Sequence, residues 1–283
     1  MKLPMKPDLS GRVAVVTGGA GVLCSEFCRA LAACGARVAV LGHTPEKVEA
    51  LAEELRAAGG EALALCADVT DREGLEKARE KLLEAWGPCS ILVNGAGGNR
   101  PDATADDEFF SPESLADPSR KSFFDLTEPA FRQVFSLNIL GTVLPTQVFA
   151  LDMARKGGGC IVNVSSMNAF TPLTKIPAYS AAKAGVSNFT EWLAVHFAGA
   201  GIRVNAIAPG FFSTAQNAKL LWNEDGTPTP RTGKILAATP MGRFGRPEEL
   251  IGALLFLCDD ACSGFVTGVV LPVDGGFRAY SGV

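Results

Sequence analysis

The chain has 283 residues, a formal net charge of −4 and a sequence pI of about 5.4, and 47% of its residues are hydrophobic. This balance argues against a nucleic-acid-binding protein, which usually carries a basic excess, and it allows a substantial core. No run approaches the ~18 consecutive apolar residues of a membrane span, and the N-terminus, broken by Pro4 and Pro7, does not resemble a secretory signal. We therefore expect a cytoplasmic protein with neither a membrane nor a nucleic-acid partner.

Short β-branched runs alternate with amphipathic stretches along the chain, a pattern that predicts a mostly parallel sheet covered by helices on both faces. The fold expected is a doubly wound, Rossmann-like α/β domain of about seven strands. The predicted strands are Val13–Thr17, Arg37–Leu41, Ala62–Cys66, Ile91–Asn94, Cys160–Val164, Arg203–Ile207 and Val269–Val273. The predicted helices are Leu23–Cys34, Pro45–Ala58, Arg72–Trp86, Pro129–Arg155, Ala178–Ala198 and a helix around Pro247–Cys258.

Two long segments interrupt this alternation, each just after a predicted strand. Residues 97–128 form a polar loop containing Phe109-Phe110 and Phe123-Phe124, and residues 211–240 contain Leu220-Leu221-Trp222. Long loops in compact domains tend to be functional lids or disordered linkers, and the aromatic content of these two favours lids that pack. With no internal repeat or linker, residues 1–283 are expected to form a single domain with these two substrate-covering loops.

Eight cysteines could suggest disulfides or a metal site. Most lie in apolar runs, none forms a Cys-x-x-Cys pair, and only two histidines are present. The pattern is typical of small buried thiols in a reducing compartment, so no metal site is expected.

A glycine turn, Gly18-Gly19-Ala20-Gly21, follows the first strand and opens the first helix. Glycines at this point let the backbone approach a pyrophosphate, which the helix N-terminus stabilises. Against the pattern Gly-x-Gly-x-x-Gly, the third position is Cys24, which is still small enough for close helix packing. Two further strands end in Asp68-Val69 and in Asn94-Gly95-Ala96-Gly97. Polar or small residues thus follow three strands at the same edge of the sheet, which favours a nucleotide site there.

The second strand ends in Leu41-Gly42-His43-Thr44, without the acid that usually holds the ribose 2′-hydroxyl of NAD and without the arginine typical of NADP users. A 2′-phosphate would meet no carboxylate, and His43 or Thr44 could contact it. NAD(H) and NADP(H) both remain open, with a slight preference for NADP(H).

Ser166, Tyr179 and Lys183 form the predicted catalytic set. Tyr179 and Lys183 are four residues apart and share one helix face. A nearby ammonium group stabilises a phenolate and brings the tyrosine pKa toward the working range, while a serine hydroxyl can hydrogen-bond to a carbonyl oxygen or alkoxide. This set suits proton transfer coupled to hydride transfer.

From Arg12 to Gly276 the chain resembles the short-chain dehydrogenases/reductases, in which Ser166 lies the usual thirteen residues before Tyr179. The family's Thr-Gly-x-x-x-Gly-x-Gly loop is matched only in its first part, since Val22 and Cys24 replace the later glycines. The resemblance implies that Tyr179 is the acid/base, that Lys183 lowers its pKa and holds the nicotinamide ribose, and that Ser166 orients the substrate carbonyl. It also implies that Asn138 holds a proton-relay water. With His43, the cofactor residues expected on this basis are Gly18, Gly21, Val22, Leu23, Asp68, Val69, Asn94, Ala96, Gly97, Tyr179, Lys183, Pro209, Gly210, Phe212 and Thr214.

Cations and amides in the loops favour a hydroxylated anion as substrate. The candidates are Arg100, Lys175, Lys219, Arg231 and Lys234, with Asn99, Asn168, Asn217 and Thr171. Segments 97–101, 165–168, 221–226 and 239–245 resemble the D-mannonate oxidoreductase (fructuronate reductase) branch of the family. This resemblance implies substrate contacts from Arg100, Asn168, Ser166 and Tyr179. The alternatives are a reductase of another keto acid such as keto-gluconate, a reductase of a 3-oxoacyl thioester, and a nucleotide-sensing regulator without catalysis. The apolar run Phe265–Val273 favours a homodimer or homotetramer.

Overall fold

Seven parallel strands form a sheet in the order β3-β2-β1-β4-β5-β6-β7 in the computed structural model, which describes residues 7–213 and 221–282. The strands are β1 Val13–Thr17, β2 Arg37–Gly42, β3 Ala62–Cys66, β4 Ile91–Asn94, β5 Gly159–Val164, β6 Ile202–Pro209 and β7 Val270–Val273. The helices are α1 Val22–Ala33, α2 Pro45–Ala57, α3 Arg72–Trp86, α4 Glu128–Phe135, α5 Gly141–Lys156, α6 Pro177–Phe197, α8 Pro230–Ala237, α9 Ile251–Cys258 and α10 Asp260–Ser263. The predicted doubly wound fold is confirmed.

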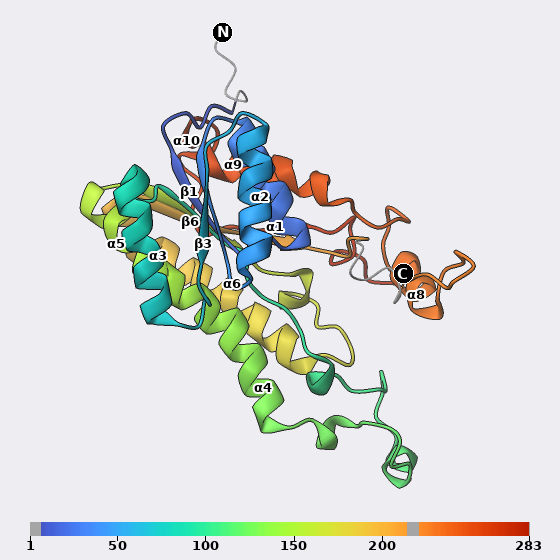
Figure 1. Cartoon of the computed structure of the whole chain (residues 1–283). Coiled ribbons are helices and arrows are strands. Elements are labelled where there is room, and N and C mark those ends of the chain that lie inside the picture. Colours follow the sequence, from blue (N-terminus) through green and yellow to red (C-terminus); the bar gives the residue numbers. More distant parts are fainter. Residues whose placement is uncertain (1–6, 214–220, 283) are drawn as a thin grey trace.

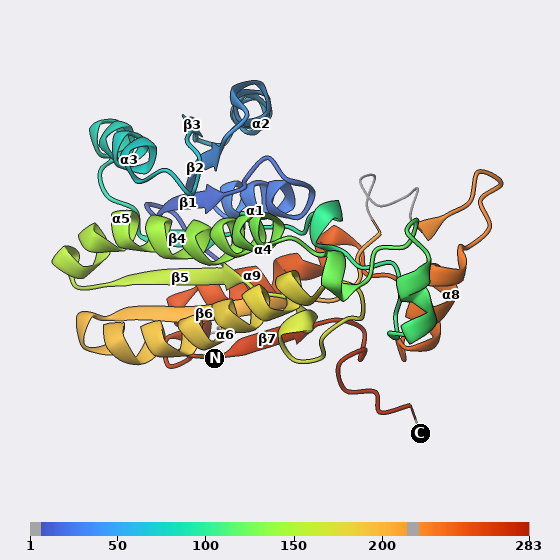
Figure 2. The same cartoon turned by 90° about the horizontal axis from the view of Figure 1, so that it is seen from below.

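Helices cover both sides of the sheet (Figures 1 and 2). Side chains alternate along each strand, so Ala14 and Val16 pack in one core with α1, α2 and α9. Val13 and Val15 pack in the second core, against α3, α5 and α6. Burial on both faces explains why the strands read as continuous apolar runs.

The strand order reverses between β1 and β4. From β1 the chain crosses to β2 on one side, and β4 pairs with β1 on the other, with Thr17 opposite Asn94 at the carboxyl ends. The crevice at such a reversal is where open α/β sheets bind their ligands. We therefore expect the residues that follow β1, β2, β3 and β4 to line a ligand site.

The predicted continuous helix Pro129–Arg155 is wrong in one respect. It divides into α4 and α5 around one wider, π-helical turn, Ser136–Leu140. The Asn138 amide Nδ2 donates to the Val134 carbonyl oxygen at 2.8 Å, and Pro145 lacks an N–H for the next turn. Such widened turns often occur at functional sites.

The two long segments contain more structure than predicted. Residues 97–128 hold three short 3₁₀ turns, and residues 211–240 contain the helix α8, whose Thr229 cap accepts from the Thr232 N–H at 3.3 Å. The expected packing is found in part: Phe124 makes edge-to-face contacts with Phe110 and Phe123, at centroid distances of 5.6 and 5.8 Å, and Leu221 is buried, whereas Phe109 is 81% exposed. Figure 2 shows both segments extending from the same end of the molecule.

The helical stretch Glu128–Lys156 is long and apolar enough to cross a membrane by length and composition alone. Half of its most apolar window is buried inside the protein. Burial of that kind is typical of a core helix packed on a sheet, which is where α5 lies.

The expected burial of the cysteines is found for Cys24, Cys28, Cys89, Cys160 and Cys258, which lie in the cores as free thiols. The expectation is wrong for the remaining described cysteines: Cys66, at the end of β3, is exposed, and two more are half-buried, Cys34 and Cys262. Among the residues that the structure describes, no group of three or more His, Cys, Asp or Glu side chains is placed to hold a metal ion.

Candidate active site

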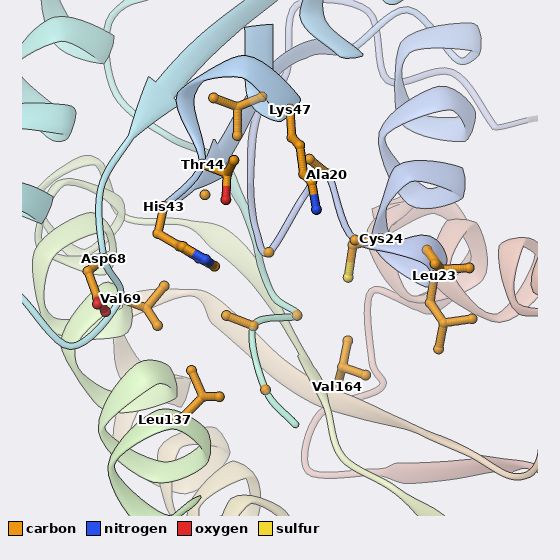
Figure 3. A pocket seen from close by; sticks show the side chains of 18 of the residues that line it. Ala20, Leu23, Cys24, His43, Thr44, Lys47, Asp68, Val69, Leu137 and Val164 are labelled. Atoms are coloured by element: carbon orange, nitrogen blue, oxygen red, sulfur yellow. The ribbon is translucent and has the colours of Figure 1, made fainter. Parts of the chain in front are cut away.

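A cavity of about 700 Å³ opens at the carboxyl ends of β1 and β4 (Figure 3). Eleven of the predicted cofactor residues line it: Gly18, Gly21, Val22, Leu23, His43, Asp68, Val69, Ala96, Gly97, Gly210 and Phe212. It is also lined by residues that the sequence did not single out as cofactor contacts, among them Lys47, Leu137, Val164 and Phe211.

The loop after β1 is shaped to receive a diphosphate. Gly18 has φ 62°, and a Cβ there would lie 2.9 Å from the Ala96 Cα, so only glycine fits. Gly21 caps α1 without a side-chain hydrogen bond, which leaves first-turn N–H groups directed at the cavity. Such amides, with the helix dipole, are what a phosphate group requires.

Another part of the cavity lining combines polar and charged side chains that follow β2 and β3 or lie in the first turn of α2. His43, Thr44 and Lys47 line it together with Asp68 (Figure 3). Asp68 Oδ1 accepts from the Thr70 N–H at 2.8 Å and from the Thr70 hydroxyl at 2.7 Å, which fixes the carboxylate in place. Lys47 was missed, although it follows Thr44 in the first turn of the next helix, where one helical turn returns a side chain to the strand end.

Cys24 lies in the cavity wall with its thiol close to β4. A Cβ added at Gly95 would meet the Cys24 sulfur at 2.2 Å, so the space that the thiol fills is available only because residue 95 is glycine. Burial raises the pKa of Cys24 to about 12, despite the positive charge of Lys183 nearby. The thiol is therefore neutral and acts as a packing group.

The three predicted catalytic side chains come together. Ser166 follows β5, and its hydroxyl accepts from the Asn168 N–H at 3.2 Å. Lys183 Nζ, on α6, lies 5.7 Å from the centre of the Tyr179 ring and donates to the Val164 carbonyl oxygen at 2.7 Å. The β5 terminus and one face of α6 therefore hold all three groups.

The protonation properties of this set differ from expectation. Burial raises the pKa of Tyr179, and the hydrogen bond with Ser166 offsets the rise only in part. Burial also lowers the pKa of Lys183 to about 8. The predicted lowering of the tyrosine pKa by Lys183 is not found in this arrangement, because the ammonium is bound to a backbone carbonyl and desolvation dominates.

Asn138 lies in the π-helical turn with its carboxamide largely engaged. Nδ2 donates to the carbonyl oxygens of Gly98 and Val134 at 2.8 Å each, and Oδ1 accepts from the Gly98 N–H at 3.2 Å. A Cβ added at Gly97 would be 2.7 Å from Asn138 Oδ1 and 3.0 Å from Lys183 Nζ. One lone pair of Oδ1 and the ammonium of Lys183 thus face the same small space beside Gly97.

Some predicted residues are not part of the cavity. Asn94 is turned into the core, where its amide donates to Thr146 Oγ1 and Asn163 Oδ1 at 2.9 Å each, and Pro209 is buried in β6. Arg100 is exposed and paired with Asp102 at 2.9 Å. Thr214, Asn217 and Lys219 lie outside the described residues.

Asn168 differs from these, because it is brought next to the catalytic set. It is 4% exposed, and its carboxamide oxygen has no hydrogen-bond partner within the described parts of the chain. A buried acceptor left unpaired is costly, so this oxygen is a candidate for contact with a ligand.

The parallel sheet, the phosphate-shaped turn and the serine–tyrosine–lysine set define an NAD(P)-binding oxidoreductase. A model of the short chain dehydrogenase family matches residues 12–225, and the chain belongs to this family. It is accordingly an NAD(P)-dependent oxidoreductase acting on alcohol or keto groups.

Relatives cover the whole chain. The uncharacterised oxidoreductase UxuB of Bacillus subtilis (strain 168) is 54% identical over 281 residues, which span 99% of this chain and 100% of the relative. A structure from Haemophilus influenzae, named provisionally as a D-mannonate oxidoreductase and holding NAD, is 53% identical with a TM-score of 0.94, and the match covers 98% of both chains. A gluconate 5-dehydrogenase from Burkholderia cenocepacia, in complex with NADP and tartrate, is 29% identical with a TM-score of 0.82 over 98% of this chain and 99% of that chain.

Proposed function

We propose that the chain interconverts a sugar acid and its keto form, D-mannonate and D-fructuronate. The observation that carries the proposal is the buried, unpartnered oxygen of Asn168, whose backbone N–H donates to Ser166, because a ligand hydroxyl would supply the donor that this oxygen lacks. A polyhydroxylated substrate supplies such a donor, whereas a fatty acyl chain does not. The 53% identity to the provisionally named D-mannonate oxidoreductase supports this choice among sugar acids.

The residues of this chain would orient the substrate and move one proton. The nicotinamide cofactor, when bound, supplies the hydride chemistry. The Ser166 hydroxyl donates to the substrate carbonyl oxygen, and the Tyr179 hydroxyl gives its proton to that oxygen during reduction or removes it during oxidation. Lys183 holds the cofactor ribose near Tyr179, and its charge favours the phenolate once its ammonium is directed toward that ring.

Asn138 would act in two ways. Its three hydrogen bonds to backbone groups hold Gly98 at the cavity floor. Its free lone pair on Oδ1 and Lys183 Nζ would share one water beside Gly97, the relay through which Tyr179 recovers its proton.

Whether the protein accepts a cofactor with a 2′-phosphate depends on the side chains at the end of β2. Lys47 adds a cation beside His43 and Thr44, and the acid that lines this part of the described cavity, Asp68, is bound to Thr70. We therefore favour acceptance of NADP(H), with NAD(H) also admitted as in the relative from Haemophilus influenzae. Asp68 would contact the adenine amino group.

Segments 97–128 and 211–240 would cover the substrate. The protein would be cytoplasmic. It would form a homodimer or homotetramer, because apolar side chains remain exposed on α6 and before β7. Trp192, Val195 and Phe265 are 56%, 81% and 105% exposed. Light scattering of the purified protein tests the number of subunits.

The function is tested with D-fructuronate, 5-keto-D-gluconate and an acetoacetyl thioester, each with NADH and NADPH. Turnover of fructuronate is expected, together with its loss by at least roughly 10³-fold in Tyr179→Phe while cofactor binding survives. Efficient turnover of keto-gluconate without turnover of fructuronate would move the assignment to that acid. Unchanged activity in Tyr179→Phe would contradict the mechanism, and cofactor binding without turnover of any keto compound would favour a nucleotide sensor.

A further inference from the structure

An ion pair joins the two long segments at the end of the molecule. Glu108, in segment 97–128, accepts from Lys234 Nζ of α8 through both carboxylate oxygens, at 2.9 and 2.8 Å. The glutamate is half-buried, with its side chain 33% exposed, and the lysine is 67% exposed. The Glu108–Lys234 pair therefore links the two segments, which extend from the same end of the molecule (Figure 2).

Two cations besides Lys234 act on Glu108 through their charge. The pKa of its carboxyl is lowered first by the hydrogen bond from Lys234 and further by the positive charges of Lys175 and Arg231. Within residues 7–213 and 221–282, the side chains of Lys175 and Arg231 make no hydrogen bond or ion pair. One carboxylate thus meets an excess of positive charge.

The neighbouring acids of segment 97–128 are engaged elsewhere. Asp102 pairs with Arg100, Asp106 accepts from the Lys121 N–H at 2.7 Å, and Asp107 pairs with Arg120. The segment therefore places a single carboxylate, that of Glu108, in the cation cluster.

Lys175 brings this cluster close to the catalytic residues. It lies in the short connection between Asn168 and Tyr179, and its backbone has φ 73°, a conformation that non-glycine residues rarely adopt. The Ala105 N–H donates to the Lys175 carbonyl oxygen at 2.8 Å, which holds this loop to segment 97–128 three residues before Glu108. Backbone strain of this kind persists where the surroundings enforce it, often at ligand sites.

We propose that Lys175, Arg231 and Lys234 form the recognition site for the carboxylate of the substrate, and that Glu108 occupies this site in the free enzyme as an internal surrogate. The inference rests on the proposed function in taking the substrate to be a carboxylic acid, but it does not depend on which acid. The carboxylate of an incoming substrate replaces the Glu108 carboxylate at Lys234. It also binds Lys175 and Arg231, the two cations whose side chains lack partners in the described parts of the chain.

This arrangement makes Glu108 a determinant of specificity. A neutral sugar cannot replace the charge-assisted hydrogen bonds between Glu108 and Lys234, so the site stays filled by the enzyme's own carboxylate. An acid competes with Glu108, and its apparent affinity is reduced by the fraction of molecules in which the glutamate is bound.

The test uses the full chain with NADH or NADPH present. In Glu108→Gln we expect the KM for D-fructuronate to fall roughly three- to tenfold with kcat changed less than about twofold, as suits the loss of a competing, partly exposed ion pair. In Lys234→Met we expect that KM to rise by roughly tenfold, while the KM for D-fructose, the neutral counterpart with a hydroxymethyl group in place of the carboxylate, changes less than about twofold. Glu113→Gln is the matched control, because it removes the same charge from the same segment, where Glu113 is bound by Ser111, and it should leave every constant unchanged.

The outcomes separate the two proposals. If Glu108→Gln raises or preserves the KM for fructuronate, the ion pair is only a structural link and the inference falls while the proposed function stands. Calorimetric titration with D-mannonate and D-gluconate gives a readout independent of turnover. Tighter binding of gluconate alone to Glu108→Gln would keep the carboxylate site and overturn the mannonate assignment. Melting temperatures of all variants check that each is folded.

Discussion

The buried ammonium of Lys183 should make the free energy of unfolding depend on pH, an effect that can be measured without substrate. The side chain is 4% exposed, Nζ donates to the Val164 carbonyl oxygen at 2.7 Å, and burial lowers its pKa from 10.5 to about 8. The folded protein thus keeps a charge in a poorly solvated place at neutral pH. The perturbation is Lys183→Met, which keeps most of the side-chain volume and removes the charge.

The sign follows from proton counting. Below pH 8 the lysine is protonated in both states, and the folded state bears the full cost of the shift, about 3 kcal/mol at 1.36 kcal/mol for each pH unit. Between pH 8 and 10.5 the folded state loses the proton first, so the unfolded state binds more protons and stability rises with pH. The free energy of unfolding of the wild type, relative to Lys183→Met, should increase by about 2 kcal/mol from pH 7 to pH 9.5.

Urea denaturation of both proteins without cofactor, at pH 7 and pH 9.5, measures this difference. Other groups titrate in both proteins and cancel in the comparison. Lys47→Met serves as the control, since it makes the same substitution at an exposed side chain. An equal stability gap between wild type and Lys183→Met at the two pH values would refute the lowered pKa.

Further predictions concern the cofactor, the core and the phosphate loop. Lys47→Glu should raise the KM for NADPH by roughly tenfold or more and that for NADH much less, as steady-state kinetics would show; equal effects on both would remove Lys47 from the 2′-phosphate. Asn94→Ala should lower the free energy of unfolding by about 2–3 kcal/mol, because it leaves a buried acceptor on β5 unpaired; a loss below about 0.5 kcal/mol would contradict this. Gly95→Ala should cost about 1–3 kcal/mol by overpacking against the Cys24 sulfur, and adding Cys24→Gly should recover part of it, since the Thr17 carbonyl oxygen, 2.9 Å from the added Cβ, remains. Failure of that double variant to recover stability would place the clash elsewhere.

The strands could be predicted closely because each is an apolar run ended by a turn residue, and all seven lie within about two residues of the expected positions. The helix α8 was missed, although Thr229-Pro230 is a typical helix start, because Gly233 follows inside it. The wider turn at Asn138 was missed, although Pro145 lies inside the predicted helix, because the Asn138 side chain that binds the Val134 and Gly98 carbonyl oxygens gives no signal in the sequence pattern.

In the site, too, features set by local sequence spacing could be predicted and features set by tertiary contacts could not. Ser166, Tyr179, Lys183 and the glycine turn could be found because their spacing along the chain is what brings them together. Asn94 was misplaced, because β4 is buried on both faces and its sequence does not say which face the side chain takes. The Glu108–Lys234 contact joins residues 126 positions apart, and no local pattern contains it.

Buried hydrogen bonds to the backbone and the ion pair between the two long segments contribute differently to stability. This difference decides which substitutions the protein can tolerate. Lys183 and Asn138 are fixed by buried hydrogen bonds to backbone groups, so a substitution there changes the stability of the protein as well as its chemistry. The Glu108–Lys234 pair lies at the surface, where solvent screens the attraction, so it contributes little to stability. A change of charge in the two long segments can therefore alter which acids or sugars bind at little cost to the fold, while the proton and cofactor chemistry at the sheet end stays as it is.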